Sequence, residues 1–219
     1  MERVPEPELM LDEVQARAYA EADFEAPHSR CIELLHERCV LPPRGWALDL
    51  GCGPGDITLR LARALPDWHI DGLDGSPAML AHASAAAARA GMTARVRFQR
   101  ALLPVDPPPR ARYDLIVTNS LLHHLADARV LWSSIMRWGG AGTGVFVMDL
   151  LRPSSDADAH ALVQRYAATE PEILQRDFYH SLRAAYRPDE VRAQLAAADL
   201  ARFTLEVVSD RHFIVWGRL

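Results

Sequence analysis

The sequence predicts an α/β protein built on a parallel sheet. Short apolar runs alternate with stretches whose apolar residues recur at helical spacing, and this alternation is typical of parallel sheets. One apolar run, 47–50, leads directly into a loop with three glycines and then into an amphipathic helix. With 219 residues, of which 49% are hydrophobic and 24% charged, the chain is long enough for one sizeable domain.

Two helices are expected before the sheet begins. Residues 9–22 and 27–40 carry apolar side chains at helical spacing, and a proline pair closes the second helix. Strands and helices then alternate, with strands over 47–50, 68–73, 96–98, 113–117 and 145–150 and helices over 57–65, 77–90 and 126–138.

The C-terminal part is predicted to be mostly helical. Residues 156–185 look helical, and 188–198 form another helix. Two short strands, 203–208 and 212–216, close the chain as a pair around a Ser-Asp-Arg turn. The fifth strand, 145–150, is continuously apolar, which predicts burial on both of its faces.

The composition limits the partners and the compartment. A net charge of −5 gives no general field for a polyanion, so we expect no nucleic-acid partner. Three cysteines show no metal-ligand spacing and leave one unpaired in any disulfide scheme, which favours a reducing compartment. The acidic N-terminus lacks the apolar core of a signal peptide, and no run approaches the ~18 apolar residues of a membrane span. We therefore expect a cytoplasmic protein with no membrane partner; the oligomeric state is not readable from the sequence.

The glycine loop predicts a ligand site. Gly51, Gly53 and Gly55 stand at alternate positions directly after the apolar run that contains Asp49. Glycines at such a turn permit positive φ and remove the Cβ that would hold a ligand away. Cys52, between the first two, is interpreted as a small residue that fills a tight loop.

The residues around the loop disfavour a phosphate ligand. A dinucleotide loop would have glycine where Asp56 stands, and a phosphate loop would have Lys followed by Ser or Thr. Asp56 lies where a helix begins, so its anion would oppose a pyrophosphate but would be favourable as an N-cap. Asp49 adds a second carboxylate. Two anions beside close-approach glycines suit a ligand with cationic groups, such as S-adenosylmethionine.

Three segments carry a family resemblance. Residues 48–55 (LDLGCGPG), 72–80 (GLDGSPAML) and 113–119 (YDLIVTN) with the following LHHL resemble, in this order, motifs of the class I S-adenosylmethionine-dependent methyltransferases of small molecules. The resemblance covers roughly residues 45–150. It implies a Rossmann-like sheet of seven mostly parallel strands with the last strand antiparallel, helices on both faces and an N-terminal helical lid.

This resemblance divides the chain into one methyltransferase domain over 1–219. Its parts are an N-terminal helical layer (1–43), a cofactor-binding core (44–150), a helical lid or substrate region (151–187) and a closing helix with a strand pair (188–219). Ligands of open α/β sheets bind at the carboxyl ends of strands, which is where we expect the site.

The expected cofactor is S-adenosylmethionine, which becomes S-adenosylhomocysteine. Asp74 ends the second strand and is predicted to accept both ribose hydroxyls. Gly75 occupies a position where the family often has an apolar residue against the adenine, and Met79 is a candidate to replace that contact. The third strand end has no acidic residue for the adenine amino group, so a backbone contact is expected there. The cofactor residues that we predict are Tyr19, Asp49, Gly51, Cys52, Gly53, Gly55, Asp74, Gly75, Met79, Ala101, Leu102 and Asn119.

The fourth strand end predicts the type of acceptor. Asn119 is followed by Ser-Leu-Leu and not by the Pro-Pro-aromatic run of amine and nucleic-acid methyltransferases, which disfavours a base-flipping enzyme. His123 and His124 are the catalytic candidates: one is expected to be structural and the other a general base. We see no cluster of histidines and carboxylates with recognised spacing and predict no metal.

The acceptor itself is not specified by the sequence. Substrate residues are expected after the fifth strand, among them Arg152, Tyr166, Tyr179 and Ser181. The predicted reaction is direct in-line methyl transfer to a small organic metabolite through O, N or S, for which the protein mainly aligns the nucleophile and excludes water. The alternatives are an NAD-type oxidoreductase and a non-catalytic S-adenosylmethionine-binding partner protein.

Overall fold

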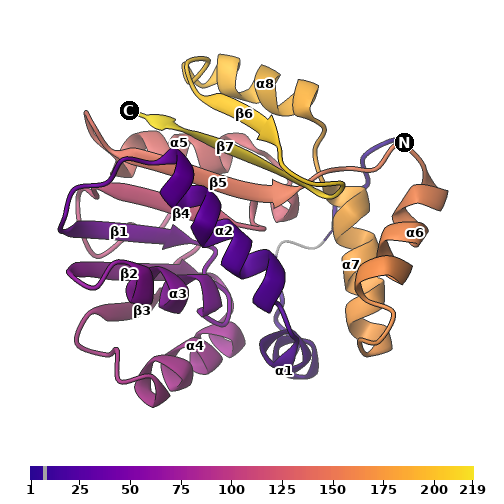
Figure 1. Cartoon of the computed structure of the whole chain (residues 1–219), viewed down its shortest axis with the longest axis horizontal. Helices are drawn as coiled ribbons and strands as arrows, with labels where there is room; N and C mark the ends of the chain where they lie inside the picture. Colours follow the sequence, from indigo (N-terminus) through magenta and orange to yellow (C-terminus); the bar gives the residue numbers. More distant parts are fainter. Residues whose placement is uncertain (7–8) are drawn as a thin grey trace.

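A seven-stranded sheet forms the centre of the computed structural model, which describes residues 1–6 and 9–219 (Figure 1). Its spatial order is β3-β2-β1-β4-β5-β7-β6, and only β7 runs against its neighbours. The strands are Gly45–Leu50 (β1), Trp68–Asp74 (β2), Val96–Arg100 (β3), Leu115–Asn119 (β4), Gly144–Leu150 (β5), Thr204–Val207 (β6) and His212–Arg218 (β7). The predicted fold class, with its last strand antiparallel, is confirmed.

Helices cover both faces of the sheet (Figure 1). Successive side chains of a strand point to opposite faces, so Ala47 and Leu48 of β1 enter different cores. The core on one face includes residues of α5 (Arg129–Trp138) and α8 (Pro188–Ala197). The core on the other face includes residues of α2 (Glu25–Arg38), α3 (Asp56–Ala64) and α4 (Pro77–Arg89).

Helices near both ends of the chain lie beyond the carboxyl ends of the strands. They are α1 (Glu13–Glu21), α6 (Asp156–Tyr166) and α7 (Glu172–Ala184), and α1 contacts both α4 and α7. Leu150 at the end of β5 packs with Val163 of α6 and Leu182 of α7 in a third, smaller core. Within the predicted N-terminal layer of 1–43, Pro7 and Glu8 lie outside the described residues.

Two predicted helices have different bounds in the structure. The stretch 156–185 is two helices and not one, because proline at position 171 cannot supply an interior helical N–H and becomes the residue that precedes α7. The first helix starts at Glu13 and not at Leu9, because the Asp12 carboxylate caps it by accepting the N–H groups of Val14 and Gln15, both at 2.9 Å.

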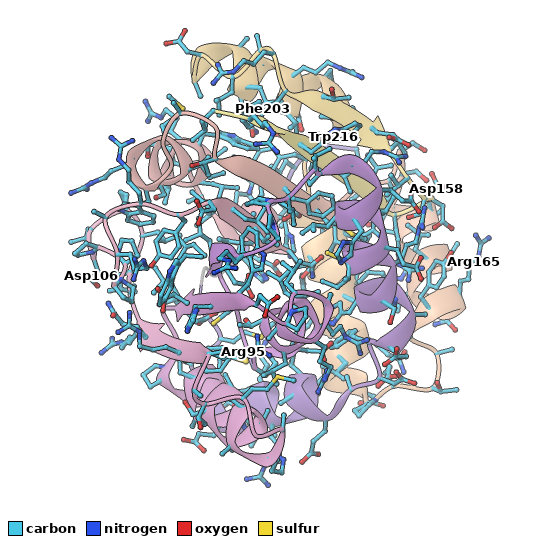
Figure 2. All side chains as sticks on the ribbon, turned by 60° about the vertical axis from the view of Figure 1, so that its left-hand side comes forward. Arg95, Asp106, Asp158, Arg165, Phe203 and Trp216 are labelled. Atoms are coloured by element: carbon cyan, nitrogen blue, oxygen red, sulfur yellow. The ribbon has the colours of Figure 1, made fainter. Side chains whose placement is uncertain are left out.

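Arg95 shows how the strand edges are tied to the helices (Figure 2). Its guanidinium donates to the main-chain oxygens of Ala62 at 3.1 Å, Leu65 at 3.3 Å and Trp68 at 3.0 Å. These oxygens lie at the end of α3 and the start of β2, so one side chain satisfies acceptors that the helix end leaves without partners. No helix of the described residues is long and apolar enough to cross a membrane.

Candidate functional site: two adjoining cavities

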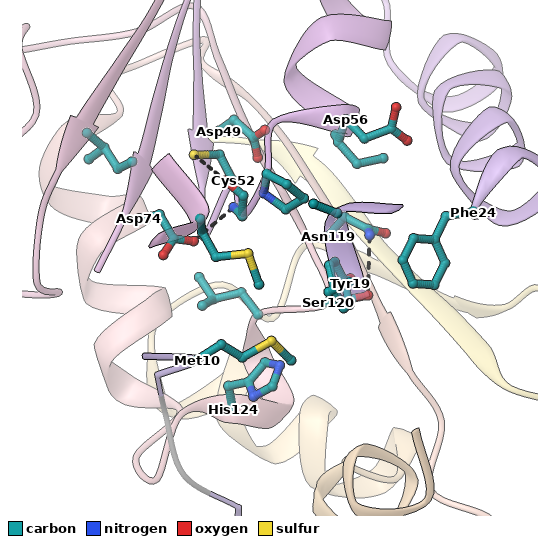
Figure 3. Close-up of a pocket in the computed structure, with 18 of the residues that line it drawn as sticks. Met10, Tyr19, Phe24, Asp49, Cys52, Asp56, Asp74, Asn119, Ser120 and His124 are labelled. Carbon is teal, nitrogen blue, oxygen red and sulfur yellow. Dashed lines mark hydrogen bonds between the residues drawn. The ribbon is translucent and has the colours of Figure 1, made fainter. Parts of the chain in front are cut away.

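The parallel register brings three predicted site segments to one edge of the sheet. Asp49 of β1 lies opposite Gly72 of β2 and Val117 of β4. The loops that follow these strands therefore open on the same side, as expected for ligand sites of α/β sheets. They line a cavity of about 350 Å³, which we call the inner cavity (Figure 3).

The glycines of the loop have separate tasks. Gly53 has a φ of +52°, and a Cβ built on it would meet no atom within 4 Å, so its backbone faces open cavity. Gly55 has a φ of +87° and is the residue before α3, where a Cβ would approach Phe98 to 2.8 Å. Gly53 and Gly51 line the inner cavity, whereas Gly55 is absent from its wall and serves the turn into α3.

Two main-chain N–H groups fix the carboxylate of Asp74 at the end of β2. The N–H of Gly53 donates to its Oδ2 and the N–H of Ser76 donates to its Oδ1, each at 2.8 Å. Burial raises the pKa of Asp74, and these two hydrogen bonds oppose that shift by favouring the carboxylate. A carboxylate fixed in this way is well placed to accept hydrogen bonds from two vicinal hydroxyl groups of a ligand.

Asp49 and Asp56, which the sequence treats alike, differ in the structure. Asp49 is buried, accepts the Thr58 hydroxyl at 2.5 Å, and has its pKa raised to about 7 by burial. Asp56 is the first residue of α3 and is preceded by Gly55 as the N-cap, so the expected N-cap role is wrong. Its carboxylate lies 2.6 Å from His28 Nδ1 and forms an ion pair with Arg60 at 2.8 Å, so Asp56 already has a cationic partner within the protein.

The wall around Gly75 is apolar. A Cβ on Gly75 would lie 2.6 Å from Leu9 Cδ2 and 3.1 Å from Leu102 Cδ2, so these two leucines fill the space that a larger residue would need. Met79 and Ala101 complete this wall. The N–H of Ala101 donates to Asp74 O at 2.9 Å and the N–H of Leu102 donates to Asp106 at 2.9 Å. Both of these N–H groups are therefore used within the protein, while the backbone contact expected for the adenine amino group stays a prediction. The side chains of this wall offer apolar packing.

The N-terminal layer covers the inner cavity from the other side. Tyr19 and Phe24 have ring centroids 4.8 Å apart, and Phe24 lies 5.1 Å from His28. Burial raises the pKa of Tyr19 to about 12, so its phenol stays neutral. Figure 3 shows Tyr19 and Phe24 beside Asn119 at the cavity wall.

Two residues at the loops complete the wall. Burial raises the pKa of the Cys52 thiol, which keeps it an inert, small wall residue. Asn119 ends β4, and its amide donates to the hydroxyl of Ser120 at 3.2 Å (Figure 3). Ser120 has a φ of +57°, which non-glycine residues seldom adopt outside constrained sites.

A second cavity of about 180 Å³ adjoins the first, and we call it the outer cavity. The two share several wall residues, among them Met10, Tyr19, Phe24, Asn119 and His124. The outer cavity extends to α6, α7 and the start of β7. A ligand that fills the inner cavity would therefore border the outer one along this shared wall.

The two catalytic candidates lie at this boundary. His123 is buried, and its Nδ1 lies 2.6 Å from the Asp149 carboxylate. Although burial opposes its protonation, Asp149 and Glu6 raise the pKa of His123. His124 lines both cavities, and its Nδ1 lies 3.2 Å from Glu6 Oε1.

The structure brings only some of the predicted substrate residues to the outer cavity. Tyr166 and Ser181 line it. Arg152 is absent from the walls of both cavities because its guanidinium turns to Glu190 at 2.6 Å and to Ala185 O at 3.1 Å. Tyr179 is also absent from them, because its hydroxyl donates to Asp156 at 2.5 Å and ties α7 to α6.

Several wall residues escaped the sequence argument. Leu9 and Met10 come from the segment before α1, and Arg211 and His212 come from the turn into β7. Glu6, from the same N-terminal segment, lies behind the wall at 3.2 Å from His124. For Leu9 and Met10 a signal existed, because an apolar pair stands between two acidic stretches. Arg211 follows a predicted turn and carries no signal beyond its charge.

The strand order and the glycine loop at the sheet edge are typical of Rossmann-like methyltransferases, and comparison with known families agrees with this class of protein. A methyltransferase domain model matches residues 48–145. The chain belongs to the class I S-adenosylmethionine-dependent methyltransferases, the family that its motifs resemble, and this excludes the NAD-type oxidoreductases as its family.

Among its relatives are two trans-aconitate 2-methyltransferases. That of Mycobacterium tuberculosis is 32% identical over 174 residues, which are 78% of this chain and 62% of that protein. That of Methylobacterium radiotolerans is 35% identical over 149 residues, 68% of this chain and 54% of that protein. The chain thus spans less than two thirds of the length of either relative. A methyltransferase structure from Aquifex aeolicus superposes with a TM-score of 0.68 at 16% identity, covering 94% of this chain and 98% of that one, and shares the fold.

Proposed function

We propose that the chain transfers a methyl group from S-adenosylmethionine in the inner cavity to a small organic acid in the outer cavity. The observation that carries this proposal is the shared wall of the two cavities, which lets two ligands meet without water between them. When bound, S-adenosylmethionine supplies a methyl group on a sulfonium, which is already a good leaving group. The protein then has to align the two ligands for in-line displacement.

The inner cavity has groups for each part of this donor. Asp74 accepts the ribose hydroxyls, Gly53 lets the backbone come close to the ligand, and Asp49 supplies negative charge for the ammonium group. Leu9 and Leu102 pack on the adenine, since their side chains form the apolar wall at Gly75. Gly51, Met79 and Tyr19 complete the enclosure.

Arg211 supports an acid as the acceptor. Its guanidinium carbon lies 3.3 Å from the centroid of the Tyr166 ring, and within the described residues no carboxylate forms an ion pair with it. Two of the acids that share the outer cavity already have partners, because Asp177 accepts from Gln15 at 2.7 Å and Asp23 from the N–H of Glu25 at 2.9 Å. A guanidinium of this kind suits a carboxylate, and the relatives above are named for an acid.

The nucleophile decides what the histidines do. A carboxylate oxygen carries no proton at neutral pH, so its methylation needs no general base. An acceptor with a hydroxyl or a protonated amine would need one, and His124 lies nearest because it lines both cavities. His123 is then the structural member of the pair, held by Asp149.

A metabolite panel tests the proposal. Release of S-adenosylhomocysteine is measured with organic acids that include trans-aconitate, and with amines, phenols and thiols. We expect turnover with one or more acids, and an increase in their KM of about tenfold or more in Arg211→Gln, which removes a charged hydrogen bond worth about 1.5–3 kcal/mol. Arg165→Gln is the matched control, because Arg165 is exposed and pairs with Asp210 outside the cavity wall.

The outcomes separate the alternatives. Turnover with amines alone would overturn the acid acceptor. Binding of S-adenosylhomocysteine with no turnover of any acceptor would favour the non-catalytic partner protein.

We expect the reaction to take place in the cytoplasm, since all three cysteines are free and two are buried, and to need no nucleic acid or membrane.

A further inference from the structure

Three side chains beside the shared wall have the geometry of a metal site. The side chains are Glu6, His123 and His124, and one nitrogen or oxygen of each lies within 4.8 Å of the others. Glu6 Oε1 is 3.2 Å from His124 Nδ1 and 3.6 Å from His123 Nε2. Ligands about 2.0–2.1 Å from a tetrahedral ion stand about 3.3 Å apart, so these two separations suit one ion between the three groups.

Other residues orient two of these ligands. The Nδ1 of His123 lies 2.6 Å from the Asp149 carboxylate, and its Nε2 lies 3.6 Å from Glu6 Oε1. When Nδ1 donates to Asp149 and a metal ion takes the place of the Nε2 proton, the Nε2 lone pair can bind that ion. A histidine that binds a metal usually donates its other ring N–H to a carboxylate, which orients the imidazole ring. Glu6 is likewise fixed, because Ser181 donates to its Oε1 at 3.0 Å.

The segment that carries Glu6 is anchored independently of Glu6. Arg3 donates to the main-chain oxygens of Ala184 at 2.6 Å, His123 at 3.0 Å and Leu125 at 3.1 Å, and its guanidinium lies 4.0 Å from the centroid of the Tyr186 ring. Arg3 therefore holds Glu6 against the histidine pair. An acidic side chain placed by such an anchor beside two imidazoles is a ligand set drawn from two distant parts of the chain.

We propose that Glu6, His123 and His124 bind one divalent first-row metal ion of the Zn²⁺ type. Two imidazoles and one carboxylate form a three-ligand set that leaves coordination positions open. Figure 3 shows His124 beside Met10 at the cavity wall, and both histidines line the outer cavity, so the proposed ion would border that cavity. If the proposed function holds, an open coordination position accepts an oxygen of the acceptor; the metal site itself stands without it.

Cobalt binding tests the site without any substrate. The full chain without a histidine tag is treated with a chelator, and Co²⁺ is added while the visible absorption bands of tetrahedral Co²⁺ are recorded. We expect one equivalent of Co²⁺ to bind, Zn²⁺ to displace it, and both Glu6→Gln and His124→Gln to weaken binding by about 100-fold or more. His160→Gln is the matched control, because His160 lies on α6 with its side chain 64% exposed, away from the three ligands, where it contacts Asp156 and the Tyr179 ring.

Two results would overturn the metal site. One is the absence of tetrahedral Co²⁺ bands in the unchanged chain, which would leave the cluster a network of hydrogen bonds between histidines and carboxylates. The other is equal Co²⁺ affinity in all four proteins. Because His124 also lines the inner cavity, a far-UV circular dichroism spectrum and a thermal melt show that each variant is folded. Binding of S-adenosylhomocysteine by the unchanged chain, measured in parallel, separates failure of this site from failure of the proposed function.

Discussion

The inner and outer cavities are built in different ways. Most of the inner wall comes from the ends of adjacent strands and the loops that follow them, so sheet register alone places Asp49, Asp74 and Asn119 together. The outer wall combines the segment before α1, two helices after β5 and the turn into β7. The inner cavity is thus shaped mainly by the strand ends of the fold, whereas the outer cavity adds to the ends of β4 and β5 several segments that lie outside the sheet.

The largest effect is expected for Asp74→Ala. If the inner cavity binds the donor through its ribose, this change removes two charge-assisted hydrogen bonds and weakens S-adenosylhomocysteine binding by about 100-fold or more. Calorimetric titration measures the Kd, and Asp106→Ala, on a nearby exposed loop, is the control. An unchanged Kd would break the assignment of the inner cavity.

Two alanine variants of the glycine loop sharpen the same assignment. Gly53→Ala places a methyl group in open cavity at a φ of +52°, so we expect a loss of donor affinity of about tenfold with about 1–2 kcal/mol of lost stability. Gly55→Ala would instead bring its Cβ within 2.8 Å of Phe98 at a φ of +87°, so stability should fall further, with a smaller direct effect on donor affinity. Equal losses of affinity and stability in the two variants would contradict the separate tasks.

The buried Asp49 predicts a pH dependence of donor binding. Its pKa is raised to about 7 in the folded chain, so it stays protonated at pH values where the unfolded chain has lost the proton. Stability of the ligand-free chain therefore falls as the pH rises from about 4 to about 7. A cationic donor favours the carboxylate, so its binding should tighten by about tenfold between pH 6 and pH 8.

Measuring the Kd of S-adenosylmethionine at several pH values checks this prediction. S-adenosylhomocysteine lacks the sulfonium charge but keeps the ammonium group that Asp49 is proposed to face, so its binding should show a similar pH dependence. Asp49→Asn should remove the dependence from both ligands. A flat profile for the unchanged chain would show that Asp49 does not sense the charge of the ligand.

The smallest effect is expected for Asp56→Asn. Arg60 already neutralises this carboxylate and His28 is hydrogen-bonded to it, so donor affinity should change by less than about twofold. Because the Asp56 side chain is 39% exposed, the lost ion pairs should lower stability by about 1 kcal/mol or less. A thermal melt and a titration measure both quantities. A loss of affinity as large as that of Asp49→Asn would mean that Asp56 faces the ligand.

The sequence predicted the sheet and the inner cavity well because both follow from local patterns. An apolar run, a glycine turn and a helix specify where a strand ends, and the ends of neighbouring parallel strands meet at one edge. Asp56 shows the limit of that argument. Its place in the sequence was clear, but its partners His28 and Arg60 depend on how α2 packs on α3.

The outer cavity escaped prediction for a physical reason. Beyond a strand end, nothing local specifies which way a side chain turns, and Arg152 turns to Glu190 of α8 and away from both cavities. Glu6 lies beside the histidines because Arg3 and Val4 fasten its segment to α7 and Ser181 donates to its carboxylate. Neither contact has a periodicity or a motif that could reveal it.

The anchor at Arg3 has a consequence for the order in which the protein forms. One of its acceptors, the main-chain oxygen of Ala184, lies 181 residues further along the chain. During synthesis β1, α3 and β2 leave the ribosome long before α7 does, and domains begin to fold from the N-terminal side. The strands and the glycine loop at the inner cavity are therefore synthesised early, whereas the segment that carries Glu6 can bind its place on the domain only after α7 has been synthesised.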